Sequence, residues 1–234
     1  MKASGVVFAA LDCDADAIEA WNRWYDLEHT PMNVSLEGIM LSRRYVAPPE
    51  LHAVRLTEDG SPFAEGRATF LTNYVVSGDP QIAFDDMSVT LPTLYETGRM
   101  TFPAEKKAVR EGDVFAGTDA VGPARLQLGS ADVSFVGHTG LIVIQRRAPD
   151  GRAERLAELD GVTGVWSMES RRRPGLFLDL VFVADDPGGR AVALREAVPH
   201  TVEPVLDAPY LLIDPMRYPW ADAIRNSDLP ATVG

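Results

Sequence analysis

The sequence has a single cysteine, Cys13, and lacks any long apolar segment. One cysteine excludes a disulfide within the chain and a zinc site built from cysteines alone. It is typical of a reducing compartment, so we expect a cytoplasmic protein. The apolar run from Val6 to Leu11 is too short for the core of a signal peptide, and no stretch approaches the ~20 apolar residues of a membrane-spanning helix.

Several motifs that would name a chemistry are also missing. The chain has no G-x-G-x-x-G or G-x-x-x-x-G-K-[ST] phosphate loop, no H-E-x-x-H pair and no G-x-S-x-G elbow. Nucleotide binding and an α/β-hydrolase triad therefore lack support. For the same reason we expect no metal and no tightly bound cofactor.

Basic residues are scarce relative to acidic ones. The chain has 34 acidic and 22 basic residues, which gives a formal net charge of −12. Because a negative field repels phosphate groups, we expect no nucleic-acid partner and no binding to an anionic membrane. A small molecule is the expected partner, and a homodimer stays open.

The length of 234 residues suits either one large domain or two modules of ~100 residues each. The pattern of apolar runs and helical stretches predicts the order β-α-β-β-α-β twice, as in two ferredoxin-like modules. Strands are expected at 5–11, 39–46, 68–76, 114–128, 141–145, 165–171, 176–184 and 210–213. Helices are expected from Asp14 or Asp16 to a break before Pro31, and at 82–96 with an interruption near Pro92, 153–159 and 191–198.

Short sequence echoes support a duplication. Leu36-Glu37-Gly38 precedes Ser42-Arg43-Arg44, and Leu159-Asp160-Gly161 precedes Ser170-Arg171-Arg172. We therefore expect an α+β protein with one module at residues 1–130 and a degenerate second module at 131–234.

The segment 21–31, WNRWYDLEHTP, is followed by Leu36-Glu37-Gly38 and then by Arg43-Arg44-Tyr45. This combination is similar to the EthD-like branch of the dimeric α/β barrel superfamily, and it covers the first half only. The resemblance implies that two ferredoxin-like sheets pair into a barrel, here within one chain because of the tandem duplication. Members include cofactor-independent monooxygenases, muconolactone isomerases, polyketide cyclases and aldoxime- or haem-using enzymes, so the fold does not name the reaction.

One face of the first helix carries aromatic and titratable side chains at helical spacing. They are Trp21, Trp24, Tyr25, Glu28 and His29. A neutral imidazole at His29 is suited to take up a proton near pH 7, although a histidine at a helix end also interacts with the last carbonyls. Trp24 and Tyr25 are expected either to wall a substrate pocket or to pack on the sheet.

Polar residues on two strands complete the predicted site. Arg43 and Arg44 point to opposite faces of their strand, and the buried one needs an anion, which is either an internal carboxylate or a substrate carboxylate or enolate. Asn73 and Tyr74 likewise lie on opposite faces, and we expect both to contact substrate. A buried asparagine requires a hydrogen-bond partner.

Together these residues favour a cofactor-independent enzyme that transfers protons on a carbonyl or phenolic substrate of aromatic or polyketide-like type, as an isomerase, cyclase or lyase. In this hypothesis His29 is the acid and base, and Arg43 or Arg44 stabilises the developing enolate. A cofactor-free monooxygenase is the nearest variant. The alternative is a non-catalytic protein that binds a metabolite or stabilises a partner. An open pocket shared by His29, an arginine and aromatic rings favours the enzyme, and a His29 sealed by Glu28 and backbone carbonyls favours the alternative.

Overall fold

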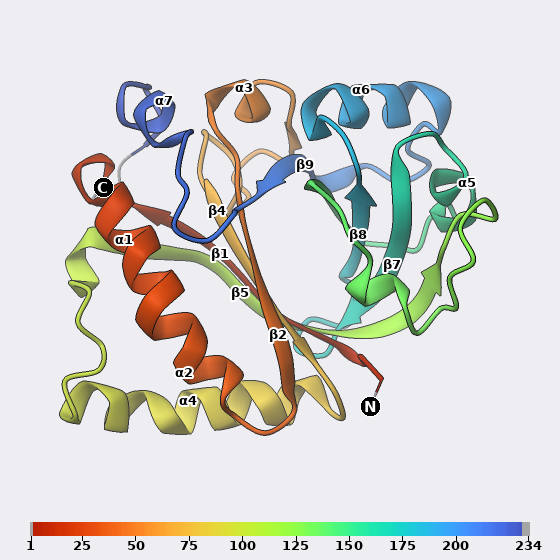
Figure 1. The fold of residues 1–234 in the computed structure, drawn as a ribbon. Coiled ribbons are helices and arrows are strands. Elements are labelled where there is room, and N and C mark those ends of the chain that lie inside the picture. Colours follow the sequence, from red (N-terminus) through yellow and green to blue (C-terminus); the bar gives the residue numbers. More distant parts are fainter. Residues whose placement is uncertain (1, 231–234) are drawn as a thin grey trace.

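The computed structural model describes residues 2–230, and the chain forms the expected order of elements in each half (Figure 1). The elements of the first half are β1 (Gly5–Cys13), a 3₁₀ turn (Ala15–Ala17), α1 (Ile18–Trp24), a π-helical turn (Tyr25–His29), α2 (Thr30–Val34), β2 (Ile39–Val46), α3 (Pro49–His52), β3 (Leu56–Thr57), β4 (Phe70–Val76), α4 (Pro80–Glu96), a 3₁₀ turn (Ala104–Lys106) and β5 (Lys107–Val121). The elements of the second half are a 3₁₀ turn (Val133–Phe135), β6 (Gly140–Arg146), α5 (Ala153–Ala157), β7 (Val162–Ser170), β8 (Phe177–Val183), α6 (Pro187–Ala197), β9 (Pro204–Leu212) and α7 (Ala221–Arg225).

The nine strands found within residues 2–230 form one antiparallel sheet in the order β2-β4-β1-β5-β7-β8-β6-β9-β3. The first half contributes β2-β4-β1-β5 and the second β7-β8-β6-β9, which is the same ferredoxin-like order in both halves. The halves join through β5 and β7, and again where Tyr45 and Val46 of β2 pair with Leu212 and Leu211 of β9. The sheet therefore closes on itself, and the predicted fold class of two ferredoxin-like modules paired within one chain is confirmed.

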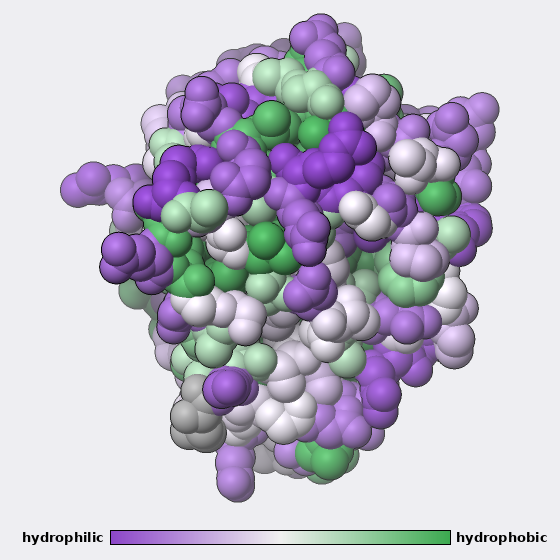
Figure 2. Space-filling view, turned by 90° about the vertical axis from the view of Figure 1, so that its right-hand side faces the viewer, coloured by the Kyte–Doolittle hydropathy of each residue, from purple (hydrophilic) through white to green (hydrophobic). Residues whose placement is uncertain are grey.

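Helices cover the outer face of this sheet. In Figure 1, α1, α2 and α4 flank the strands of the first half, whereas α5 and α6 flank those of the second. Figure 2 shows the second-half side, on which hydrophilic side chains surround small groups of apolar ones. None of the helices in the described part of the chain is both long and apolar enough to cross a bilayer.

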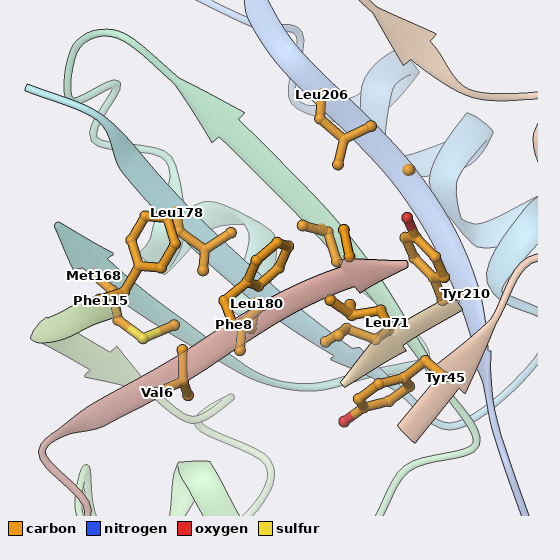
Figure 3. Packing of buried hydrophobic residues seen from close by; sticks show 14 of the residues in the cluster. Val6, Phe8, Tyr45, Leu71, Phe115, Met168, Leu178, Leu180, Leu206 and Tyr210 are labelled. Atoms are coloured by element: carbon orange, nitrogen blue, oxygen red, sulfur yellow. The ribbon is translucent and has the colours of Figure 1, made fainter. Parts of the chain in front are cut away.

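The inner face of the sheet is packed with apolar side chains from both halves (Figure 3). Phe8 of β1 meets Phe115 of β5 edge to face at 5.8 Å, and Leu180 and Tyr210 of the second half belong to the same cluster. Burying such surfaces is the main favourable contribution to folding. Because the halves share one core, the division at residue 130 stays a prediction.

Two expected helix boundaries are wrong. The helix does not end before Pro31, because a π-helical turn at Tyr25–His29 leads directly into α2. The wider turn bonds the Thr30 amide to the Tyr25 carbonyl and makes room for a proline, which has no N–H and clashes in a regular helix. Helix α4 also continues through Pro92, where Ser88 and Pro92 are both exposed, so water can satisfy the carbonyl that Pro92 leaves unbonded.

Candidate functional site

The predicted aromatic face of the first helix lies against the outer face of the sheet and forms a cluster of rings. Trp21 and Trp24 are 1% and 5% exposed, and each of the two rings contacts both Tyr25 and Phe102. Phe102 comes from the segment 97–103, which we call the strap, because it connects α4 to the 3₁₀ turn before β5 and passes beside α1 (Figure 1). We call Trp21, Trp24, Tyr25 and Phe102 the aromatic cluster.

His29 packs against this cluster. Its ring stacks on Trp24 with 4.5 Å between centroids and meets the edge of Tyr25 at 4.7 Å. Its Nε2 lies 3.2 Å from Nδ2 of Asn33, which also donates to the hydroxyl of Tyr74 at 3.0 Å. The π-helical turn ends at His29, and such turns occur frequently at functional sites. The structure therefore brings four predicted residues, Trp24, Tyr25, His29 and Tyr74, into one connected group.

The imidazole of His29 is neutral at ordinary pH. Its pKa is lowered to about 3, mainly by burial and to a smaller extent by the positive charges of Lys107 and Arg44. Because the amide nitrogen of Asn33 can only donate, we assign the lone pair to Nε2 and the proton to Nδ1. Nδ1 is buried and has no hydrogen-bond partner in residues 2–230. His29 therefore presents an N–H donor, and its low pKa makes it a poor general base near pH 7.

Arg44 also faces this side of the sheet, but its guanidinium is already engaged. It donates to Oδ1 of Asp26 at 2.8 Å and to Oδ1 of Asn22 at 2.5 Å, and it lies over the Tyr25 ring at 4.2 Å. Both side chains of the Arg44–Asp26 pair are 6% exposed. The anion that a buried arginine requires is thus internal, and Arg44 holds α1 against the sheet.

Lys107 is a residue of the site that the sequence analysis missed. Its ammonium lies 4.9 Å from the ring of Trp24 and 5.7 Å from that of Trp21, which places it within cation–π range. Burial lowers the pKa of Lys107, and the side chain makes no hydrogen bond or ion pair within the described residues. The sequence has three lysines, Lys2, Lys106 and Lys107. This scarcity is the one sequence feature that could have drawn attention to Lys107.

A cavity opens where the strap meets α1. It measures about 510 Å³. Its lining includes Ala17, Ala20, Trp24 and Leu27 from α1 and the turns at its two ends, and Phe102 and Pro103 from the strap. A second cavity of about 390 Å³ lies on the other side of the strap and shares Leu27 and Glu28 with the first. Between them the hydroxyl of Thr101 donates to Oε2 of Glu28 at 2.8 Å. Glu28 thus ties down the strap and does not seal His29, while Trp24 connects the larger cavity to the imidazole.

Arg43 and Asn73 lie on the opposite, inner face of the sheet, away from His29. Arg43 donates to the carbonyls of Ser134 and Phe135, and Asn73 is its cross-strand neighbour. On the same face, the hydroxyl oxygen of Tyr45 lies 2.9 Å from Nε2 of His138. These contacts fasten the connection between the halves to β2, so Arg43 and Asn73 do not join the group around His29.

Asn73 provides a test of this inner face. It is 2% exposed, and neither its amide nitrogen nor its amide oxygen has a partner in the described residues. An unpaired buried amide costs stability, so Asn73→Leu is expected to raise the free energy of unfolding by about 1 kcal/mol in urea titrations. Asn33→Leu is the matched control, because its amide bonds to His29 and Tyr74, and its loss is expected to cost about 1–3 kcal/mol. Equal destabilisation by the two variants would contradict the assignment.

Within residues 131–230 no equivalent aromatic group lies on the first helix of the second half. Its helix α5 spans only Ala153–Ala157, and buried ion pairs stand near it instead. Arg146 pairs with Asp179 at 2.5 Å, and Arg152 pairs with Asp150 at 2.6 Å. Within residues 2–230 no group of three or more His, Cys, Asp or Glu side chains is placed to hold a metal ion.

Comparison with known proteins supports the fold alone. No protein-family model and no curated protein matches the sequence. Among solved structures, the chain is similar to a protein of Fusobacterium nucleatum described as a putative monooxygenase, with a TM-score of 0.53 and 8% identity over 92% of this chain and 94% of that one. A protein of Lactobacillus acidophilus with the same description gives a TM-score of 0.41 and 9% identity over 90% of this chain and 100% of that one. At 8% identity the agreement with the Fusobacterium nucleatum protein shows a shared arrangement of helices and strands alone, and membership of the EthD-like branch stays a prediction.

Proposed function

We propose that this protein is an enzyme that stabilises the anionic form of a small carbonyl or phenolic molecule. The observation that carries the proposal is the buried N–H of His29, which lacks a partner and stands among aromatic rings close to the uncompensated ammonium of Lys107. A neutral imidazole donor and a nearby cation favour negative charge on a substrate oxygen. Isomerisation, cyclisation or elimination through an enolate or phenolate is the chemistry that such a site serves best.

His29 then has a different role from the general base expected from the sequence. A base with a pKa of about 3 removes protons inefficiently at pH 7, whereas a neutral N–H donor keeps its function across that range. The substrate's own acidic proton passes to solvent water, since phenols and 1,3-dicarbonyl compounds become acidic when their anion is stabilised. Substrate reaches Nδ1 when the strap residue Phe102 moves away from Trp24, because His29 itself does not line the cavity.

Oxygenation is a second candidate, supported by the description of the Fusobacterium nucleatum neighbour. A stabilised enolate or phenolate is also the electron-rich species that reacts with O₂, so the same residues suit either outcome. Consumption of O₂ during turnover distinguishes the two. A protein that binds such a molecule without converting it is the remaining alternative.

The test uses a substrate found by screening phenols and 1,3-dicarbonyl compounds against the whole protein. His29→Phe keeps a ring stacked on Trp24 but removes the donor, and we expect kcat to fall about 10²-fold. Lys107→Met is expected to lower kcat about 10-fold, whereas Lys2→Met serves as a control that changes nothing. Because His29 stays neutral from pH 5 to 8, its protonation should cause no change in kcat over this range. Full activity of His29→Phe would reject the proposal, and a loss of activity below pH 6.5 that disappears in this variant would restore the general-base role.

A further inference from the structure

Two cations near the aromatic cluster have no anionic partner. Lys107 lies over Trp24, and Arg23 lines the cavity one residue before Trp24 in α1. Neither side chain makes an ion pair or hydrogen bond within the described residues. Carboxylates outnumber cations in this chain, at 34 acidic against 22 basic residues, yet none pairs with Arg23 or Lys107 within residues 2–230. Unpaired positive charge beside a cavity favours a negatively charged ligand.

The other charged groups at the cavity are already occupied. Lys106 bonds to Asp16 at 2.9 Å and also pairs with Asp14. Glu28 accepts the hydrogen bond of Thr101. Arg23 is therefore the cation at the rim that remains available, and it is exposed to solvent.

The walls of the cavity are apolar and partly flat. Ala17 and Ala20 lie one turn apart, and their small side chains leave the space that the cavity occupies. Leu27 also lines the cavity and is 52% exposed. Trp24 and Phe102 contribute ring surfaces. A volume of about 510 Å³ is within the usual range for small-molecule sites, and flat apolar ligands pack well against such rings.

We propose that the substrate is a planar aromatic or alicyclic acid that also carries a phenol or keto oxygen. Its flat body occupies the cavity against Trp24 and Leu27, and its carboxylate pairs with Arg23. Its second oxygen is the one that gains charge near Lys107 and His29. The inference rests on the proposed function, because it assigns the substrate class of that same site. The sequence suggested Arg43 or Arg44 as the partner of a substrate carboxylate, but both have internal partners. The proposal assigns this role to Arg23.

The experiment measures binding by calorimetry and does not require turnover. The probes are 6-hydroxy-2-naphthoate and 2-naphthol, which differ in the carboxylate. We expect the carboxylate probe to bind more tightly, and Arg23→Gln to weaken it about fivefold while leaving 2-naphthol unchanged. Ala20→Leu, at an exposed position, fills the hollow and is expected to weaken both probes at least tenfold. Arg217→Gln, an exposed arginine elsewhere, is the matched control and should change neither.

The outcomes separate this inference from the proposed function. Equal effects of Arg23→Gln on the two probes, no effect of Ala20→Leu, or no binding of either probe at millimolar concentration would overturn the substrate class. His29→Phe is expected to keep probe binding within about twofold, because the imidazole does not line the cavity and the ligand oxygen reaches it only after Phe102 has moved for turnover. If Arg23→Gln discriminates between the probes while His29→Phe keeps full turnover, the proposed catalytic role fails and the acid-binding site stands.

Discussion

The free energy of unfolding is expected to fall as the pH is lowered from about 7 to about 4.5, before most carboxylates titrate. Three histidines cause this, because burial lowers their pKa values: to about 3 for His29, about 2 for His52 and about 4 for His138. In the unfolded chain each of them has a pKa near 6.5. Below pH 6.5 the unfolded state therefore binds protons that the folded state does not.

The sign follows from linkage. Stability rises with pH wherever the unfolded state holds more protons, at about 1.4 kcal/mol per pH unit for each such proton. With three histidines the slope approaches about 4 kcal/mol per pH unit near pH 5, is about half as large at pH 6.5 and is nearly gone by about pH 7.5. The loss ends for each histidine once the pH falls through its folded pKa.

Urea titrations at half-unit intervals from pH 4.5 to 8 measure this slope. His52→Gln keeps a polar side chain beside Thr69, whose hydroxyl lies 3.3 Å from Nε2 of His52. It should lower the slope near pH 5 by about 1.4 kcal/mol per pH unit, the contribution of one proton, and leave the plateau above about pH 7.5 in place. A free energy of unfolding that stays constant between pH 5 and 7 would show that these imidazoles are protonated in the folded protein.

Asp26→Ala is expected to destabilise the protein by about 3–5 kcal/mol at pH 7. The substitution leaves the guanidinium of Arg44 buried without its counter-charge. It also removes the acceptor of the Met216 amide and of the Tyr218 hydroxyl, at 2.8 and 2.6 Å, so the C-terminal segment loses two hydrogen bonds to the first helical stretch. The large cost comes from the unpaired buried charge, and it does not measure what the intact pair contributes.

Two further variants complete this test. The double variant Asp26→Leu with Arg44→Met removes both charges and should recover most of the loss. Asp214→Ala breaks the exposed pair with Arg217, whose side chains are 64% and 79% exposed, and should change stability by less than about 0.5 kcal/mol. If Asp26→Ala costs no more than Asp214→Ala, the Arg44 pair is solvated and its structural role is wrong.

The sequence predicted those features that depend on local order. Strand and helix periodicity indicated β-α-β-β-α-β in each half, since side chains alternate along a strand and repeat every 3.6 residues along a helix. The same spacing placed Trp21, Trp24, Tyr25 and His29 on one helix face, where the structure has them. Alternation also required Arg43 and Arg44 to face opposite sides of the sheet, as they do.

Only the tertiary structure decided which of these side chains meet and in what chemical state. The helix continues past Pro31 through a π-helical turn, so Asn33 follows His29 on one face and fixes its tautomer, a contact hidden by the expected break. Asp26 forms an ion pair with Arg44, and the ammonium of Lys107, at the start of β5, lies over the ring of Trp24. Charge pairing and desolvation depend on distances between segments remote in sequence, whereas periodicity depends on neighbours along the chain. The sequence by itself therefore determined the architecture and the aromatic face, and folding turned His29 from an expected base into a neutral donor.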